Sequence, residues 1–336
     1  KYSYILYFKI FIILLKIIME SLKPKIAIVG AGSIGSTFAY SLMISGLARE
    51  IVLIDNNEKL AKGECLDLNH GLSFIDRIKI SATGFEGCKD ADIVVISAGA
   101  EQKTEQPRSE LAVENVAVFK EIIPEITQYA KNAILLVVSN PVDILTYVTL
   151  KISGFQASKV IGSGTVLDSN RLKYMIGESC KVDMQNVHAY IIGEHGDSEF
   201  PLWSNATIFG IDIEKYCTLY ARLNNGKNEL TQLFVNIKNS AFEIIKTKGI
   251  ANYSIALALV KIIKAIILNK NLILPVSTLI YDYYGINDVC ISIPAIVNKQ
   301  GVEQFLKPEL SEYEQELFIH SANTLKLLIK QSMFNF

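Results

Sequence analysis

The sequence lacks an excess of charge of either sign, with 33 lysines and arginines against 34 acidic residues and a formal net charge of −1. Without a basic surplus to neutralise phosphates, we do not expect the chain to bind nucleic acid. Cysteine is scarce as well: there are five, at positions 65, 88, 180, 217 and 290, and no two stand at CxxC or metal-ligand spacing. We therefore expect no metal site and a reduced, cytoplasmic protein.

Internal repeats and low-complexity linkers are also missing from the sequence. Half of the 336 residues are apolar and 20% are charged, which is typical of globular proteins. A chain of this length forms one large domain or two. Because no linker separates its halves, we expect the halves to pack closely.

Residues 2–18 form a run made almost entirely of tyrosine, isoleucine, leucine and phenylalanine, interrupted by Lys9 and Lys16. Its length is near the lower limit for a membrane span, about 17 residues. The two lysines, the lack of a small-residue cleavage site and the strand that soon follows argue against a signal or anchor helix. Met19 precedes a normal domain start, so we predict that residues 1–20 are a dispensable extension or upstream sequence. A membrane anchor is the alternative.

From Lys25 onward, apolar strand-like runs alternate with segments of helical length. The runs are KIAIV at 25–29, EIVLID at 50–55, DIVVIS at 92–97 and AILLVVSN at 133–140, and residues 34–46 show helical spacing. Strands that are apolar throughout and separated by helices indicate a parallel sheet covered on both faces. Right-handed crossovers then predict a doubly wound α/β fold.

After about residue 160 the pattern changes. We expect a helix at 167–178, a strand entering a loop at 186–196, a long amphipathic segment at 226–268, a strand at 292–298 and a final helix. This mixture predicts a second domain of the α+β type. We place the boundaries at residues 21–163 for the first domain and 164–333 for the second.

The segment Gly30-Ala31-Gly32-Ser33-Ile34-Gly35 matches the pattern G-x-G-x-x-G directly between a strand and a helix. Gly30 would make the tight turn, Gly32 would let a pyrophosphate approach, and Gly35 would allow close packing of helix and strand. The helix N-terminus would bind the phosphates through free N–H groups. The pattern predicts a Rossmann-type dinucleotide site formed by Gly30, Gly32, Ser33, Ile34 and Gly35.

Asp55 stands at the end of the second strand, where an acidic side chain can accept hydrogen bonds from the adenosine ribose hydroxyls. The same carboxylate would repel a 2′-phosphate, which predicts NAD rather than NADP. The alternative is a glycine-rich turn followed by a chance acidic residue.

Three separated segments carry further polar residues. His195 lies in a glycine-flanked loop, GEHGD at 193–197, after an apolar strand. Asp168 and Arg171 stand three residues apart on a helix and hence on one face. The polar segment 98–108 leaves a buried strand at its carboxyl end, where α/β sheets bind ligands, and ends in Arg108. Taken singly, these are equally a structural histidine, a solvated ion pair and an ordinary loop.

Four motifs occur in order: GAGSIG, SNPVD at 139–143, GTVLDSNRLKYMIGE at 164–178 and NVHAYIIGEHGDSE at 186–199. In these motifs the chain resembles the L-lactate/malate dehydrogenase family, and the resemblance extends from about residue 25 to about residue 330. Four long motifs in family order are far more specific than any one of them.

The resemblance implies a role for each matching residue. His195 would be the general acid that protonates the keto oxygen as hydride arrives from NADH, and the base in reverse. Asp168 would orient the imidazole and favour its protonated form. Arg171 would hold the substrate carboxylate through two parallel hydrogen bonds. Arg108, carried on a lid, would polarise the carbonyl.

Four further positions are implied to line the pocket. Asn140 would contact substrate and nicotinamide, and Ile255 would pack on the nicotinamide face. Gln102 stands where malate members carry arginine, and a neutral amide leaves a second carboxylate unpaired at a cost on the order of several kcal/mol. This favours pyruvate and lactate as substrates. Ala251 is closer to the malate pattern, and the lid lacks the usual Pro-Gly pair, so a malate or broad 2-hydroxy-acid dehydrogenase is the alternative.

Lys173 and His188 match the positions at which bacterial members bind the effector fructose 1,6-bisphosphate between subunits. Lysine keeps the charge of arginine but loses its bidentate contact with phosphate. Both residues could equally be packed or solvated, so the two interpretations are balanced. The resemblance also implies a homotetramer.

Overall fold

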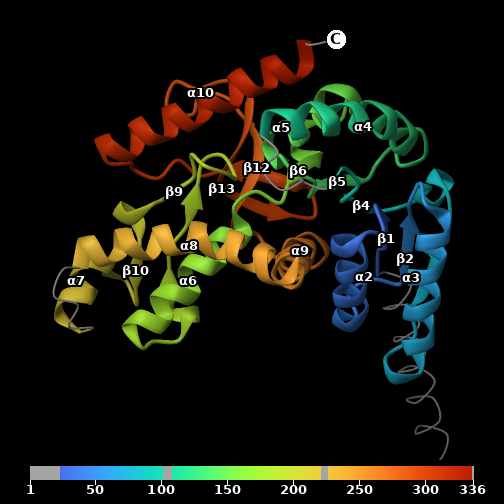
Figure 1. The fold of residues 1–336 in the computed structure, drawn as a ribbon, viewed down its shortest axis with the longest axis horizontal. Coiled ribbons are helices and arrows are strands. Elements are labelled where there is room, and N and C mark those ends of the chain that lie inside the picture. Colours follow the sequence, from blue (N-terminus) through green and yellow to red (C-terminus); the bar gives the residue numbers. More distant parts are fainter. Residues whose placement is uncertain (1–22, 101–107, 221–225, 335–336) are drawn as a thin grey trace, which may run out of the picture.

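The computed structural model describes residues 23–100, 108–220 and 226–334. In this part of the chain, helices cover both faces of one large sheet (Figure 1). The six strands of the first half are all parallel and lie in the order β3-β2-β1-β4-β5-β6. They are β1 (Lys25–Val29), β2 (Glu50–Ile54), β3 (Lys79–Ala82), β4 (Ile93–Ile96), β5 (Ile134–Val137) and β6 (Val160–Gly162).

Three strands of the second half continue the same sheet beyond β6 with antiparallel pairing. They are β12 (Leu272–Ile280), β13 (Val289–Asn298) and β14 (Gly301–Phe305). The junction is the pair Ser277 and Gly162, where a Cβ atom added to the glycine would lie 2.7 Å from that of the serine. A residue without a side chain is therefore needed where the two halves of the sheet meet.

Alternate residues of the parallel strands face opposite helical layers, as the two-residue period of a strand requires. Ala27 and Val29 of β1 belong to one core cluster, and Ile26 and Ile28 belong to the other. The first cluster is covered by α4 (Arg108–Tyr129), α5 (Val142–Ser153) and α10 (Glu312–Phe334). The second is covered by α2 (Ser33–Ser45), α3 (Glu58–His70) and α9 (Tyr253–Ile267).

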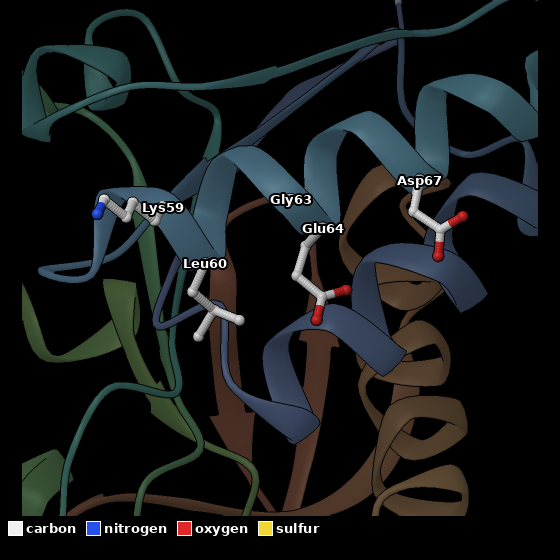
Figure 2. Close-up of a pocket in the computed structure, with 5 residues that line it drawn as sticks. All are labelled: Lys59, Leu60, Gly63, Glu64 and Asp67. Atoms are coloured by element: carbon white, nitrogen blue, oxygen red, sulfur yellow. The ribbon is translucent and has the colours of Figure 1, made fainter.

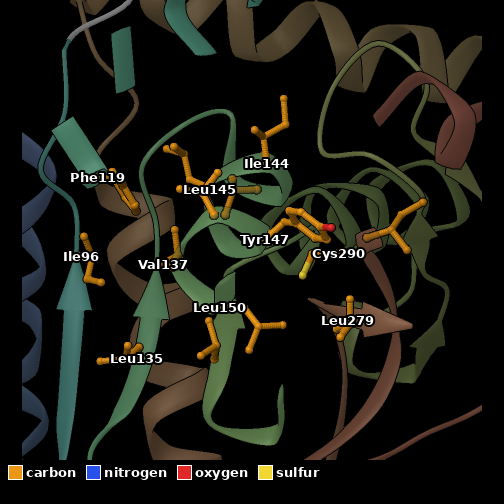
Figure 3. Packing of buried hydrophobic residues seen from close by; sticks show 14 of the residues in the cluster. Ile96, Phe119, Leu135, Val137, Ile144, Leu145, Tyr147, Leu150, Leu279 and Cys290 are labelled. Carbon is orange, nitrogen blue, oxygen red and sulfur yellow. The ribbon is translucent and has the colours of Figure 1, made fainter. Parts of the chain in front are cut away.

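The first cluster crosses the sequence midpoint and thereby joins the two halves of the chain. Figure 3 shows side chains of β4 and β5 beside Leu145 and Tyr147 of α5, with Leu279 and Cys290 of the second half packed in the same cluster. At about 25 cal/mol per Å² of apolar area removed from water, this shared burial stabilises the two halves as one unit.

A smaller layer of the second half lies around a third core cluster, to the lower left in Figure 1. Its helices are α6 (Val166–Cys180), α7 (Ile213–Leu219) and α8 (Gly226–Lys248). Its strands are β7 (Val187–His188), β10 (Thr207–Ile208) and β11 (Ile211–Asp212). The pair β8 (Ile191–Ile192) and β9 (Phe200–Pro201) connects this layer to the first cluster, to which Ile192 and Phe200 belong. Short 3-10 helices lie at Gly71–Phe74, Phe85–Cys88, Ala157–Lys159, Met184–Asn186 and Trp203–Asn205.

Two expectations for the second half need correction. The strand expected at 186–196 is divided into β7 and β8, which pair with different partners, β10 and β9. The amphipathic segment expected at 226–268 is divided into α8 and α9, because Gly249 adopts a φ of 90°, which ends the helix. The strands β12 and β14 were not expected, since a short apolar run is ambiguous between helix and strand.

No helix within the described ranges combines the length and apolarity that a membrane crossing requires. The predicted apolar extension, residues 1–20, lies outside the described residues.

Candidate active site

The carboxyl ends of β1 and β4 meet at the glycine-rich turn. Gly30 has a φ of +102°, and a Cβ atom on it would lie 2.5 Å from the backbone N of Ala98, which follows β4. A Cβ atom on Gly35 would lie 1.8 Å from the carbonyl oxygen of Gly30. Both positions therefore require glycine for reasons of backbone geometry.

Gly32 differs from its two neighbours because a Cβ atom there would meet nothing within 4 Å among the described atoms. It is the N-cap of α2, and in the described chain no side chain caps this helix end. Ser33 is exposed and Ile34 half-buried in the first turn. The first N–H groups and the positive end of the helix dipole therefore face open space, an arrangement that suits a pyrophosphate.

Asp55 lies just beyond β2 with its carboxylate turned toward the same turn. Oδ2 accepts a hydrogen bond from the backbone N–H of Ala31 at 2.7 Å, and Oδ1 accepts one from that of Asn57 at 2.8 Å. These two bonds orient the carboxylate beside the glycine-rich turn, where a ribose attached to the pyrophosphate would lie. The fingerprint residues and Asp55 thus form a cradle that fits a dinucleotide.

A buried asparagine connects the ends of β4 and β5. Asn115 of α4 accepts a hydrogen bond from the N–H of Ala100 at 2.7 Å and donates one to the carbonyl oxygen of Asn140 at 2.7 Å. Asn140 is exposed and forms a cis peptide bond with Pro141. Asn115 therefore holds both the start of the segment that contains Gln102 and the backbone of Asn140.

Asp168 is the centre of the second group of polar residues. It is only 3% exposed, and its two oxygens divide between two partners. Oδ2 lies 2.7 Å from Nδ1 of His195, and Oδ1 accepts a hydrogen bond from Nη1 of Arg171 at 2.9 Å. The structure thus brings His195, Asp168 and Arg171 together from two elements, although 27 residues separate His195 from Asp168.

This arrangement changes the pKa values of the pair. Burial alone would raise the pKa of Asp168, but the nearby positive charges of His195 and Arg171 outweigh it and lower that pKa. For His195, burial opposes the charged form, yet the charge and hydrogen bond of Asp168 raise its pKa to about 9. The imidazole is therefore protonated at neutral pH, with Nδ1 facing Asp168.

The loop that carries His195 is held by its backbone. The N–H of His195 donates to Oδ2 of Asp143 at 2.7 Å, and Gly193 forms a two-way backbone bridge with Ser292 of β13 at 3.0 and 3.1 Å. The N–H of Glu194 donates to Oγ of Ser321 on α10 at 2.7 Å. Three elements therefore fix three successive residues of the loop.

Helix α9 borders the glycine-rich turn from the other side. Nδ2 of Asn252 donates to Oγ1 of Thr37 on α2 at 2.7 Å, which ties the start of α9 to the cofactor cradle. Ile255 of α9 and Ile34 of α2 pack against the same core cluster, and Ala251 is half-buried just before the helix. Gln102 lies outside the described residues, as does the side chain of Arg108, the first residue of α4.

Lys173 and His188 lie on α6 and β7. Nζ of Lys173 stands 4.7 Å from the ring centre of Tyr190, and burial together with the charge of Lys261 lowers its pKa to about 8. His188 is exposed.

A hollow of about 270 Å³ is lined by Lys59, Leu60, Gly63, Glu64 and Asp67 of α3 (Figure 2), none of which is a predicted site residue.

Comparisons with known families agree with this geometry. Residues 24–162 match the NAD binding domain of lactate/malate dehydrogenase, and residues 165–335 match the alpha/beta C-terminal domain of the same enzymes. The chain belongs to the lactate/malate dehydrogenase family. The predicted family, the Rossmann-type α/β fold, the NAD cofactor and the class of NAD-dependent oxidoreductase are thereby confirmed.

Individual members of the lactate/malate dehydrogenase family are similar over almost their whole length. An L-lactate dehydrogenase of Acetivibrio thermocellus is 50% identical over 306 residues, which cover 91% of this chain and 96% of that protein. One of Clostridium botulinum is 49% identical over 302 residues, which cover 90% and 95%.

Two solved structures of lactate dehydrogenases have the same fold. One comes from a deep-sea metagenome library of the Medee basin, with a TM-score of 0.89, 41% identity and coverage of 93% of this chain and 99% of that one. The other is a minor L-lactate dehydrogenase of Enterococcus mundtii, with a TM-score of 0.89, 37% identity and coverage of 94% and 100%.

Sequence reasoning missed several residues that support the site in this lactate/malate dehydrogenase, among them Asn115, Asp143 and Ser292. Asp143 lies within the SNPVD motif, so the motif contained it without indicating its task. An acidic residue in the first turn of an otherwise largely apolar helix was the available signal, because a carboxylate that is buried with such a helix needs a partner. Asn115 and Ser292 carry no comparable local signal.

Proposed function

We propose that this enzyme is an NAD-dependent L-lactate dehydrogenase that interconverts pyruvate and (S)-lactate. The observation that carries the proposal is the position of Asp168 between His195 and Arg171. One buried carboxylate thereby holds a proton donor and a carboxylate-binding guanidinium side by side, which is what a small 2-keto acid requires.

The roles of the residues follow from this arrangement. Arg171 binds the substrate carboxylate. A lysine could not replace it, because only a guanidinium group offers two parallel donors. His195, held by Asp168 through Nδ1, passes its proton to the keto oxygen through Nε2 on the opposite edge of the ring. In lactate oxidation the neutral imidazole takes the hydroxyl proton. We assign Arg108 to polarise the carbonyl and exclude water once substrate is bound.

The cofactor cradle supplies the other half of the site. Bound NADH supplies the hydride that reduces the keto carbon. Gly32 and the N-terminus of α2 would hold the pyrophosphate, and Asp55 would accept hydrogen bonds from the adenosine ribose. Asn140 and Ile255 would border the nicotinamide.

Substrate choice depends on Gln102, whose neutral amide supplies no partner for a second carboxylate. We propose pyruvate rather than oxaloacetate for this reason, with Ala251 as the one position closer to the malate pattern. The direct test is NADH consumption by the full chain with pyruvate and with oxaloacetate at pH 7. Preferential turnover of oxaloacetate would contradict the proposal and support the malate alternative.

We further propose fructose 1,6-bisphosphate as an effector bound at Lys173 and His188. Burial and, after it, the charge of Lys261 lower the pKa of Lys173, and a bound phosphate would favour the charged form of both lysines, which supports the proposal. Titration of the bisphosphate should lower the pyruvate concentration needed for half-saturation, and Lys173→Gln should abolish that response. An unchanged saturation curve near pH 7 would contradict the effector role.

We also propose that the protein is a homotetramer and that it acts in the cytoplasm, in glycolysis and fermentation. Its two domains are proposed to span residues 21–163 and 164–333. Exposed apolar side chains on the adjoining helices α2 and α9 support the assembly, because large apolar patches mark subunit contacts. They are Tyr40, Ile44, Tyr253 and Leu257. Sedimentation of the purified protein tests the assembly, and a monomer at micromolar concentration would contradict it.

A further inference from the structure

A second carboxylate lies beside His195 and has no part in the mechanism above. Glu199 immediately precedes β9 and is 7% exposed. Its Oε2 atom stands 4.0 Å from Nδ1 of His195, on the same ring nitrogen that faces Asp168. A ring nitrogen of His195 and one carboxylate oxygen each of Asp168 and Glu199 all lie within 4.8 Å of one another.

Two carboxylates this close in a buried site cannot both be ionised without a large cost. Asp168 has the direct contacts, a hydrogen bond from Arg171 and the 2.7 Å contact with His195, and these keep it ionised. Within the described part of the chain, Glu199 forms no ion pair other than the longer contact with His195. Burial and the charge of Asp168 accordingly raise the pKa of Glu199 to about 8.

Among the described residues, the charged groups that act on this cluster come from three helices and the His195 loop. From α6 come Asp168 and Arg171, from α8 comes Lys238, and from α5 comes Asp143. Lys238 is also anchored nearby, because its Nζ donates to the carbonyl oxygen of Asp197 at 2.7 Å. With Glu199 neutral, the innermost charges of Asp168, His195 and Arg171 sum to one positive charge, which matches a single substrate carboxylate.

We propose that Glu199 is a positioning residue for His195: it is protonated at neutral pH, and its ionisation at higher pH holds the proton on the imidazole. This deepens the proposed function, since an imidazolium that survives into alkaline solution keeps the enzyme competent to reduce a keto acid. The effect is reciprocal, because two interacting groups titrate as a coupled pair.

The test is a histidine titration by NMR on the full protein, which contains only four histidines. His195→Asn assigns the resonance. In Glu199→Gln, which removes the negative charge but keeps the shape, we expect the His195 midpoint to fall by at least about one pH unit, because a unit charge about 4 Å away has nearly this effect even in water and a larger one in a buried site. Glu58→Gln, at an exposed position on α3, should leave the midpoint unchanged. An equal midpoint in Glu199→Gln and the wild type would overturn the proposal.

A second measurement needs no variant and no turnover. With glutamate labelled at its carboxyl carbon, one resonance of the wild-type protein should titrate near pH 8, far above the ordinary range of glutamate. The absence of any glutamate that titrates above about pH 6 would also overturn the proposal. Both readouts are independent of the substrate, so they remain decisive even if pyruvate turnover fails and the proposed function falls.

Discussion

The backbone N–H of His195 donates a hydrogen bond to Oδ2 of Asp143 at 2.7 Å, across 52 residues of sequence. Asp143 is 1% exposed and lies in the first turn of α5, and its other oxygen accepts a hydrogen bond from Oγ of Ser292 at 3.3 Å. Burial raises the pKa of Asp143 to about 6. The catalytic loop is thus positioned through its main chain by one carboxylate, while the His195 side chain is positioned by another.

Asp143→Ala should remove this backbone support. The buried N–H of His195 would lose its acceptor, which costs about 1–3 kcal/mol of unfolding free energy. Because the His195 loop also loses a hydrogen bond that fixes its position, kcat/KM for pyruvate should fall by at least about tenfold. Asp143→Asn keeps an oxygen acceptor and should retain most of the stability. Urea unfolding and steady-state kinetics on both variants check this, and equal stability of Asp143→Ala and wild type would refute it.

The direction of catalysis should change with pH around the pKa of His195. Pyruvate reduction uses the imidazolium and should persist up to about pH 9, whereas lactate oxidation uses the neutral ring and should increase through the same range. The pKa of His195 in the folded protein lies above its ordinary value of 6.5. The stability that this shift adds to the folded state is therefore complete below pH 6.5 and is lost as the pH rises through about 9. In Asp168→Asn, the alkaline limit of pyruvate reduction should move toward pH 6.5 or below. A profile unchanged in that variant would contradict the assigned role of Asp168.

Arg171→Lys should weaken substrate binding while the fold remains intact. Lysine keeps the charge but cannot make two parallel hydrogen bonds to a carboxylate, a loss of about 2 kcal/mol or roughly thirtyfold in kcat/KM. Most of the loss should appear in KM for pyruvate. Arg49→Lys, at an exposed residue that pairs with the half-buried Glu50, is the matched control and should leave the kinetics unchanged. Equal KM values for Arg171→Lys and wild type would exclude Arg171 as the carboxylate ligand.

Substitution of two glycines of the same turn should have different effects, one on cofactor binding and the other on stability. Gly32→Ala adds a methyl group where nothing described lies within 4 Å, so stability should change by less than about 1 kcal/mol while KM for NADH rises. Gly35→Ala places its methyl group 1.8 Å from the carbonyl oxygen of Gly30 and should destabilise the fold by about 3 kcal/mol or more. Thermal unfolding and NADH titration separate the two effects. A large loss of stability in Gly32→Ala would contradict the proposed open approach for pyrophosphate.

The local pattern of the chain was sufficient to predict most of the parallel sheet and the cofactor cradle. The continuous apolar runs at β1, β2, β4 and β5 reflect burial on both faces, and the spacing of Gly30, Gly32 and Gly35 reflects the backbone of one turn. The pairing of Asp168 with Arg171 could be predicted in the same way, because a helix places residues three apart on one face.

Long-range contacts were beyond the sequence and were decided by the tertiary structure. The hydrogen bonds that Asp143 accepts from the His195 N–H and from Oγ of Ser292 span 52 and 149 residues, and the approach of Glu199 to Asp168 depends on how the loop is anchored. Sequence periodicity determines which face of a helix or strand is apolar, since that depends on neighbours along the chain. Which carboxylate keeps its proton depends instead on burial and on charges from other elements, and these exist only once the chain has folded.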